Sequence, residues 1–492
     1  MSKKFLIRTH GCQMNENDSE RIAGLLVEDG MVPTDSAEDA DVIVLNTCCI
    51  RENADNKLYG ALGNLKSLKA DRPEVQILVG GCLAQKDKDL IQQRAGHVDV
   101  VMGTFNVHRT TELLAQARVE GPVMEVLEAA VLDENELFPT GLPTDRAVDY
   151  QSWVTIQVGC DNSCAFCIVP AVRGPEISKP FGDLVAEVEG LAADGVSEIT
   201  LLGQNVNSYG RDLALRLRSA DHHFEEREFE RIAGAEWTHG DRRARPLFAD
   251  LLRAVGSVEG IHRVRYTSPH PKDLRPEIIA AMAETDSVCE HLHLPLQSGS
   301  DTVLAAMHRG YTAERFLDKV RLARAAIDDL AITSDIIVGF PGETEQDFLG
   351  TLEVAAEVGF DAVYTFIYSP RPGTEAAEMV ESFVDHAVAV ERMERLRAVV
   401  ERSSLRANQA RIGRTDEVLV EGVSKRNPEM LTGRTRHNKL IHFPSSSKIR
   451  PGTYAKVEVT DASLNHMLGE LIEITHPARH RTKIPVLAAG PQ

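Results

Sequence analysis

The sequence predicts an α/β protein built from three domains. Two observations support this. Short apolar runs alternate with helical patterns in two successive series, and a third series of apolar runs has no helices between its members. The length agrees, because the 492 residues correspond to about three domains at roughly 100–200 residues each.

The N-terminal domain, residues 1–115, contains three strand-like runs, and each leads through a short loop into a helical pattern. Short buried strands that alternate with helices form parallel sheets, so we expect a Rossmann-like parallel α/β domain. Residues 116–148 turn irregular and acidic and contain several prolines, which predicts a linker. The three runs are Phe5–Ile7, Asp41–Leu45 and Val75–Val79.

The central domain, residues 149–385, shows six further strand-like runs, most of them followed by helical patterns. Six consecutive βα units predict a partial (β/α)6 barrel. Residues 211–245 interrupt the series with many charged residues and little periodicity, so we expect a surface insertion whose histidines, His222, His223 and His239, are solvated. The six runs are Trp153–Val158, Glu198–Leu202, Ile261–Thr267, His291–Leu296, Ile332–Val338 and Ala362–Ile367.

The C-terminal domain, residues 412–476, follows a predicted connecting helix at 386–411 and precedes a loose tail at 477–492. Its short apolar runs are separated by Gly and Pro, which predicts a small antiparallel β-barrel. The runs are Glu417–Val420, Leu440–Phe443, Tyr454–Val459 and Leu468–Ile474.

The composition indicates neither a membrane-spanning nor a secreted chain. There is no apolar run of about 18 residues or more, and Phe5–Ile7 is too short for a signal-peptide core, so we expect a cytoplasmic protein. The net charge of −20, taken alone, argues against a nucleic-acid partner. However, residues 405–450 carry ten Lys or Arg against four acidic residues, a net charge of +6. On a small β-barrel this predicts a nucleic-acid-binding surface; a solvated surface of mixed charge is the alternative.

Eight cysteines in a cytoplasmic chain of this size indicate metal binding or catalysis rather than a disulfide framework. Three of them, Cys160, Cys164 and Cys167, are separated by three and then two residues and follow a predicted strand. In a tight loop, three thiolates can bind three irons of one [4Fe–4S] cluster and leave the fourth iron open to an amino-carboxylate group. A structural zinc site is the alternative, but it needs a fourth ligand, and none lies close in sequence.

A second set of cysteines, Cys12, Cys48 and Cys82, is scattered in sequence, yet each follows one of the three N-terminal strands. Parallel strands of one sheet end at the same edge, so we expect the three thiols to converge there. The alternative is three cysteines buried in a core. Cys289 has an apolar context and is expected in the core, and Cys49 should point away from Cys48 as a bystander.

These cysteines also carry a resemblance to a known family. The Cys160–Cys167 loop, with Phe166 before its last cysteine, resembles the cluster loop of radical-SAM enzymes. Three further cysteines ahead of it are typical of methylthiotransferases, and their surroundings resemble the MiaB-type tRNA branch of that family. The matching stretches are Thr9–Asn15, Asn46–Arg51, Gly81–Gln85, Gly203–Gly210, Leu294–Ser300 and Ile337–Thr344, and Gly433–Thr435 with Asn438–Lys439 resembles a TRAM domain.

The resemblance implies two [4Fe–4S] clusters and S-adenosylmethionine as cofactors. Cys160, Cys164 and Cys167 would hold the catalytic cluster of the radical-SAM barrel, and Cys12, Cys48 and Cys82 the second one. Six other residues would contact S-adenosylmethionine, namely Phe166 against the adenine, Gln204 at the methionine amino group, and Ser268, Gln297, Gly339 and Gly342 through polar or backbone groups.

The implied activity is methylthiolation of C2 of N6-isopentenyl(dimethylallyl)-adenosine at position 37 of tRNA, next to the anticodon. S-adenosylmethionine would serve both as methyl donor and as source of a 5′-deoxyadenosyl radical. The implied partners are the anticodon stem-loop of tRNA, an electron donor such as a flavodoxin or ferredoxin, and the iron–sulfur assembly machinery.

Two alternative functions remain open. The first is a methylthiotransferase acting on threonylcarbamoyl-adenosine or on a ribosomal protein. The second is a non-catalytic iron–sulfur redox sensor that binds RNA.

Overall fold

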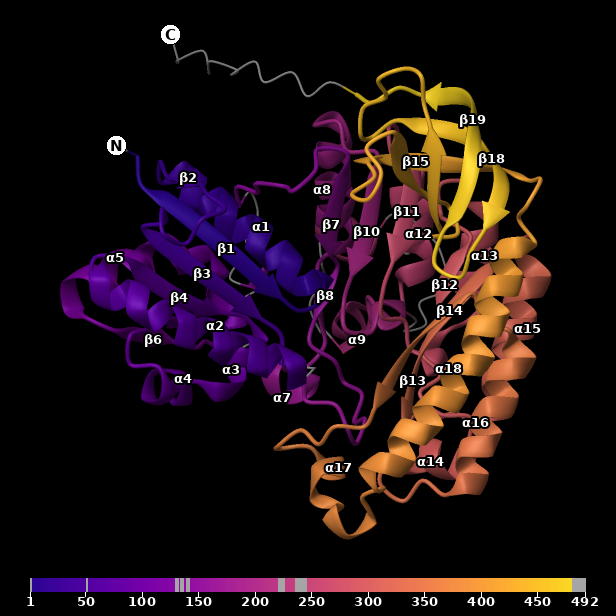
Figure 1. The fold of residues 1–492 in the computed structure, drawn as a ribbon, viewed down its shortest axis with the longest axis horizontal. Coiled ribbons are helices and arrows are strands. Elements are labelled where there is room, and N and C mark those ends of the chain that lie inside the picture. The colour runs from indigo at the N-terminus through magenta and orange to yellow at the C-terminus, as the bar shows by residue number, and fades with distance from the viewer. Residues whose placement is uncertain are drawn as a thin grey trace.

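The computed structural model describes residues 2–49, 52–128, 132, 137–138, 142–219, 226–234 and 246–479, which form three domains (Figure 1). The expected fold class is confirmed: a parallel α/β domain is followed by parallel strands with helices outside them and then by a closed five-stranded barrel. Within these residues, no helix combines the length and the apolar composition that crossing a membrane requires.

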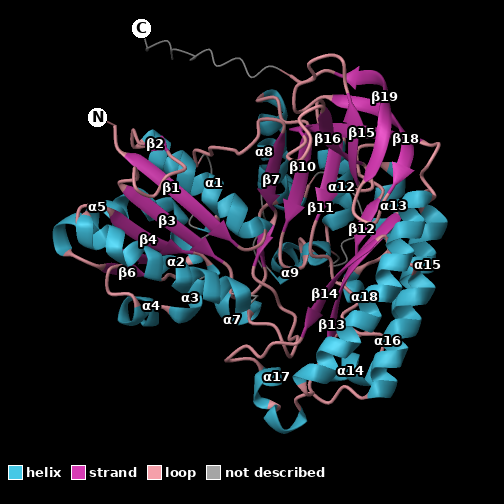
Figure 2. Ribbon diagram, in the orientation of Figure 1, coloured by secondary structure: helices cyan, strands magenta, loops and turns pink. Residues whose placement is uncertain are grey.

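The N-terminal domain is a parallel sheet in the order β2-β1-β3-β4-β5-β6, with helices on both faces (Figure 2). Ile43 and Leu45 of β3 belong to the core under α2 and α3, and Val42 and Val44 belong to the core under α1 and α5. Both faces are buried, which is why the strands read as continuous apolar runs. The bounds are β1 Lys4–His10, α1 Gln13–Glu28, β2 Val32–Pro33, β3 Val42–Thr47, α2 Glu52–Asp71, β4 Gln76–Gly80, α3 Cys82–Asp87, α4 Asp89–Arg94, β5 Val100–Met102, α5 Thr110–Glu120 and β6 Val123–Glu125.

The central domain has two three-stranded parallel sheets, β7-β10-β11 and β12-β13-β14, joined by a bridge between Val264 and Val288. The six strands curve as part of a barrel with helices on the outside (Figure 1). The strands are β7 Gln151–Thr155, β10 Glu198–Leu202, β11 Arg263–Tyr266, β12 His291–His293, β13 Ala331–Val338 and β14 Ala362–Ile367, with a short antiparallel pair, β8 Gln157–Val158 and β9 Ile177–Ser178. The helices are α7 Val169–Arg173, α8 Phe181–Ala193, α9 Arg211–Ser219, α10 Glu226–Ala233, α12 Phe248–Gly256, α13 Pro276–Glu284, α14 Asp301–Ala306, α15 Ala313–Ala326, α16 Glu345–Val358 and α17 Glu375–Glu378.

The C-terminal domain follows the long helix α18, His386–Gln409, which packs along β14 and α16. Its barrel closes in the order β15-β16-β17-β19-β18. All pairs are antiparallel except β17 with β19, which is parallel, so the expected antiparallel barrel is correct but for this pair. The strands are β15 Thr415–Val423, β16 Met430–Thr435, β17 Leu440–Pro444, β18 Tyr454–Ala462 and β19 Met467–His476.

Two expectations about the connections between elements differ from the structure. Residues 116–125 are not linker, because α5 runs to Glu120 and β6 is the last strand of the N-terminal sheet. Residues 211–245 are not merely a surface insertion, because Ile232 and Ala233 of α10 are 0% and 3% exposed within the central core. His222, His223 and His239 lie outside the described residues.

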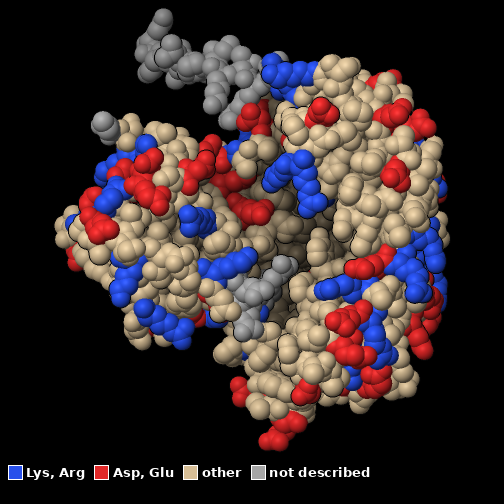
Figure 3. Space-filling view, in the orientation of Figure 1, with Lys and Arg blue, Asp and Glu red and all other residues tan. Residues whose placement is uncertain are grey.

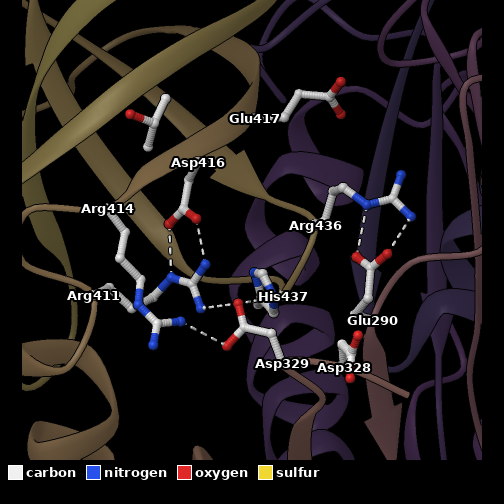
Figure 4. A pocket seen from close by; sticks show the side chains of 10 residues that line it. Glu290, Asp328, Asp329, Arg411, Arg414, Asp416, Glu417, Arg436 and His437 are labelled. Carbon is white, nitrogen blue, oxygen red and sulfur yellow. Dashed lines mark hydrogen bonds and ion pairs between the residues drawn. The ribbon is translucent and has the colours of Figure 1, made fainter. Parts of the chain in front are cut away.

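Ionic contacts fix the C-terminal domain against the central one. Arg263 of β11 is fully buried, and its guanidinium lies 2.9 Å from Glu417 of β15. Nearby, a cavity of about 310 Å³ is lined by charged side chains of both domains, and Figure 4 shows Arg411 and Arg414 reaching toward Asp329 there. Their guanidinium nitrogens are 3.0 and 3.1 Å from its carboxylate, and His437 is 3.2 Å away.

Candidate active site

The three scattered N-terminal cysteines meet at one edge of the sheet. Cys12 follows β1 as the N-cap of α1, Cys48 follows β3, and Cys82 begins α3 after β4. Because β1, β3 and β4 are neighbouring parallel strands, their carboxyl ends bring these residues together as expected. The side-chain hydrogen bond with Cys48 lowers the pKa of the Cys12 thiol to about 6.

Gly81 allows α3 to start close to β3. Its φ is 90° and its ψ is −167°, a conformation that essentially only glycine adopts. A Cβ atom here would overlap the side chain of Asn46 and lie 2.7 Å from the carbonyl oxygen of Thr47. Because Gly81 has no side chain, the backbone can approach the end of β3 closely, and Cys82 lies beside it.

Cys49 is not separated from the other thiols, contrary to our expectation. Its side chain is 1% exposed and forms a hydrogen bond with Cys82. That bond, together with burial, raises the pKa of the Cys49 thiol, whereas the same bond and then the charge of Arg173 lower the pKa of Cys82. The N-terminal site thus contains four thiols, and Cys49 ionises less readily than Cys12 or Cys82.

Arg173 is a site residue that was not among the candidates predicted from the sequence. It ends α7 in the central domain, and its guanidinium Nε and Nη2 donate to Sγ of Cys82 at 3.3 and 3.2 Å. Nη2 also lies 3.4 Å from Asp18 of α1. The side chain is 5% exposed, so this contact between domains is shielded from water.

The second triad lies in the loop that follows β8. The loop is held by its backbone: the Cys160 amide donates to Gly174 at 3.1 Å, the Cys167 amide to Cys164 at 3.0 Å and the Ala165 amide to Met307 at 3.1 Å. Burial raises the pKa of Cys160 to about 11 and that of Cys167 to about 12. A bound cation would therefore be needed to hold both as thiolates at neutral pH.

Arg309 faces this triad and was also missed by sequence reasoning. Its Nη1 donates to Sγ of Cys164 at 3.2 Å and its Nε to the hydroxyl of Tyr311 at 3.3 Å. Like Arg173 it is 5% exposed. No local sequence pattern distinguishes it from other arginines.

Each triad offers three thiols to a cofactor. Among the described residues, no three His, Cys, Asp or Glu side chains converge closely enough to hold one metal ion. A four-iron cluster takes each thiolate at a different corner, so its ligands surround a volume rather than a point. The three predicted thiol ligands of each triad fit this donor set.

The expected cofactor contacts all lie at carboxyl ends of barrel strands, the edge that also carries the Cys160–Cys167 loop. Gln204, Ser268 and Gln297 follow β10, β11 and β12. Oε1 of Gln204 is buried without a partner among the described residues. Ser268 and Gln297 have φ angles of 60° and 68°, and such backbone strain is concentrated at functional sites. An amino-acid ligand fits this edge, because an amino group could satisfy Gln204.

Phe166 and the turn after β13 are brought together in one apolar cluster that also contains Phe340 and Ile337. The amides of Gly339 and Gly342 are already bonded, to Glu343 at 2.8 Å and to the carbonyl of Ser382 at 2.8 Å. Only the carbonyl groups of these two glycines are therefore left to contact an adenine.

Comparisons with known proteins match all three domains. Residues 4–103 match the Uncharacterized protein family UPF0004, 154–355 the Radical SAM superfamily and 409–472 the TRAM domain. A protein of Streptomyces coelicolor named tRNA-2-methylthio-N(6)-dimethylallyladenosine synthase is 50% identical over 475 residues, which are 95% of this chain and 87% of that protein. This chain belongs to that synthase family.

Other similarities also span most of the chain. A relative of the same name from a Parafrankia species is 49% identical over 96% of this chain and 91% of its own. Among solved structures, the radical S-adenosylmethionine methyltransferase TsrM from Kitasatospora setae covers 77% of both chains with 13% identity and a TM-score of 0.48. Radical-SAM methylthiotransferases use S-adenosylmethionine and iron–sulfur clusters, as the resemblance implied.

Proposed function

We propose that this chain methylthiolates C2 of N6-isopentenyl-adenosine at position 37 of tRNA. The observation that carries the proposal is the presence of two thiol triads, one at the strand edge of each α/β domain, linked by Arg173. A radical-SAM enzyme with one chemical step needs only the second triad. The first gives a place where the sulfur to be transferred can be held.

We assign Cys160, Cys164 and Cys167 to the radical-SAM cluster and Cys12, Cys48 and Cys82 to the second cluster. When bound, the clusters and S-adenosylmethionine supply the electron, the radical, the methyl group and the sulfur. The chain orients them: Gln204 offers a carbonyl oxygen to the methionine amino group, and Phe166 and the residues around it pack against the adenine. Cys48, Cys82 and Cys160 are buried and the other three thiols of the triads are half-buried, which limits the access of water to the reacting groups.

The tRNA would contact exposed loops of the C-terminal barrel rather than its whole basic stretch. Within the described residues, at least five of the ten cations there form ion pairs, namely Arg411, Arg414, Arg434, Arg436 and Lys439. Lys425 and Arg426, between β15 and β16, and Lys448, between β17 and β18, are exposed and have no carboxylate within 4.0 Å in the described part of the chain. Figure 3 shows Lys and Arg side chains bordering the hollow beside the N-terminal domain, where an anticodon loop could enter.

Nucleoside mass spectrometry tests the activity. The anaerobically reconstituted protein is given reductant, S-adenosylmethionine and isopentenylated tRNA, and we expect a methylthio group on that adenosine. Cys160→Ala should yield no 5′-deoxyadenosine, whereas Cys12→Ala should still yield it but leave the RNA unmodified. Modification of threonylcarbamoyl-adenosine or of a ribosomal protein instead would show the substrate to be wrong, and two intact clusters without cofactor cleavage would favour the redox sensor.

A charge-reversal variant tests the RNA surface. Replacing Lys425, Arg426 and Lys448 by Glu should weaken tRNA binding and reduce the slope of log affinity against log salt by about 0.7–0.9 for each phosphate group that the protein no longer neutralises. Lys66→Glu, at an exposed position of α2, is the control and should bind tRNA as the parent does. Unchanged affinity in the triple variant would place the tRNA elsewhere.

We further propose that the reaction takes place in the cytoplasm with electrons from a flavodoxin or ferredoxin, and that the iron–sulfur assembly machinery loads both triads. The supporting reason is chemical, because the proposed mechanism consumes low-potential electrons.

A further inference from the structure

Two buried arginines each contact one thiol of a different triad. Arg173 donates twice to Cys82, at 3.2 and 3.3 Å, and Arg309 donates once to Cys164, at 3.2 Å. Both guanidinium groups belong to side chains that are only 5% exposed. One cation therefore faces each set of proposed cluster ligands.

The charge of Arg309 has no carboxylate to balance it. Within the described residues, no Asp or Glu oxygen lies within 4.0 Å of its guanidinium, and its polar side-chain partners are the Tyr311 hydroxyl and Cys164. A buried, uncompensated charge is strongly destabilising. The negative charge of a ligated thiolate is the available compensation.

Arg173 has a carboxylate nearby, but its better contacts are to sulfur. The distance to Asp18 is 3.4 Å, longer than either contact with Cys82. The residue lies six positions after Cys167, and its neighbour Gly174 accepts the amide hydrogen of Cys160. The backbone at this point of the chain therefore contacts the Cys160–Cys167 triad, whereas the Arg173 side chain contacts the N-terminal triad.

We propose that Arg173 and Arg309 are positioning residues that raise the reduction potentials of the two clusters separately, Arg173 for the N-terminal cluster and Arg309 for the radical-SAM cluster. The proposal rests on the ligand assignment made above. Reduction adds negative charge to a cluster, and a nearby cation with N–H···S hydrogen bonds stabilises the reduced form. The unusual feature is that the central domain supplies the cation for the N-terminal cluster.

Redox titration monitored by electron paramagnetic resonance, on the full-length reconstituted protein, tests the proposal. Arg173→Gln should shift the midpoint of the N-terminal cluster to more negative potential by at least about 59 mV, a tenfold change for one electron, and leave the other cluster unchanged. Arg309→Gln should do the reverse, so each variant is the control for the other. The signals are assigned with Cys82→Ala and Cys164→Ala.

Lysine variants separate charge from shape. Arg173→Lys and Arg309→Lys keep the cation and should retain the cluster. Their midpoints should lie between those of the parent and the Gln variant or, where the Gln variant loses its cluster, stay close to that of the parent. Unchanged midpoints in both Gln variants, or equal shifts of both clusters in either one, would overturn the proposal. Lys variants whose midpoints are shifted as far as those of the Gln variants would overturn it too. Parent-like iron content in Cys82→Ala and Cys164→Ala would instead refute the ligand assignment itself.

Discussion

At the scale of single residues, the thiol sites depend on neighbours that bind no metal. Gly81 allows the turn before Cys82, because the Asn46 side chain occupies the space that a Cβ atom would need. Arg173 contacts the Cys82 sulfur from the central domain. The geometry of the triad is therefore set before any cofactor is bound.

Gly81→Ala should remove the N-terminal cluster while leaving the radical-SAM cluster in place. The backbone strain costs about 1–3 kcal/mol, and the added Cβ would also overlap Asn46. Iron per purified chain should fall by about half, because one of two four-iron clusters is lost.

Gly121→Ala is a matched control. Gly121 has nearly the same backbone conformation, with φ 90° and ψ −165°, but nothing lies within 4 Å of its Cβ position. This variant should lose stability yet keep its iron. Equal iron loss in both variants would mean that backbone strain, and not the overlap with Asn46, causes the loss of the cluster.

The sequence was sufficient to propose all six ligating cysteines, because spacing and strand ends are local signals. It was insufficient for Arg173 and Arg309, which lie 91 and 145 positions from the cysteines that they contact. Nothing near either arginine in the chain specifies its partner. The contact between Cys49 and Cys82 was missed because it too joins residues of different βα units.

At the scale of elements, the long apolar strands were predictable and the short ones were not. The six barrel strands were located within a few residues, whereas β2, β5, β6, β9 and β16 were missed. Runs of two or three residues, such as β2 and β5, carry too little pattern to stand out. In α10 the apolar stripe of Phe229, Ile232 and Ala233 was obscured by charged residues around it.

Ile232→Ala should destabilise the central domain and show that α10 is part of its core. The side chain is fully buried, and truncating such an Ile costs roughly 2–5 kcal/mol. Calorimetry should detect a lower unfolding temperature for the central domain. Val119→Ala, at a site that is 86% exposed, should change little. A parent-like unfolding temperature for Ile232→Ala would mean that the helix is dispensable.

At the scale of the whole molecule, ionic contacts orient the C-terminal barrel. The order of the three domains followed from the sequence, but their docking did not, because it depends on pairs such as Arg263 with Glu417 that are distant in the chain. Similar pairs with carboxylates of the central domain engage four cations of the basic stretch that the sequence had indicated as an RNA surface, namely Arg411, Arg414, Arg436 and Lys439.

Asp329 should make this docking sensitive to acid. Its contact with His437, and then the charge of Arg411, hold its pKa well below the ordinary 3.8. Because the pKa is depressed in the folded state, the stabilisation is present above pH 3.8 and is lost as the pH falls further. Asp329→Asn should thus loosen the barrel at pH 7, with a difference from the parent that shrinks below pH 3.8.

Proteolytic cleavage rates within the C-terminal domain measure the loosening. Asp328→Asn changes a neighbouring carboxylate that lines the same cavity (Figure 4) but forms no ion pair in the described structure. It should be cleaved as slowly as the parent. A constant difference between Asp329→Asn and the parent at every pH would contradict the assignment.

The contact of Arg173 with Cys82 also has a consequence for biosynthesis. A ribosome completes Cys82 well before it adds Arg173, which lies 91 residues later. A nascent N-terminal domain therefore exposes a thiol site that still lacks its cation, and any iron inserted at that moment would be poorly retained. Arg309 is added later still, 145 residues after Cys164. Neither triad therefore has its cation until the central domain has been made, and both should be loaded only after that domain is translated.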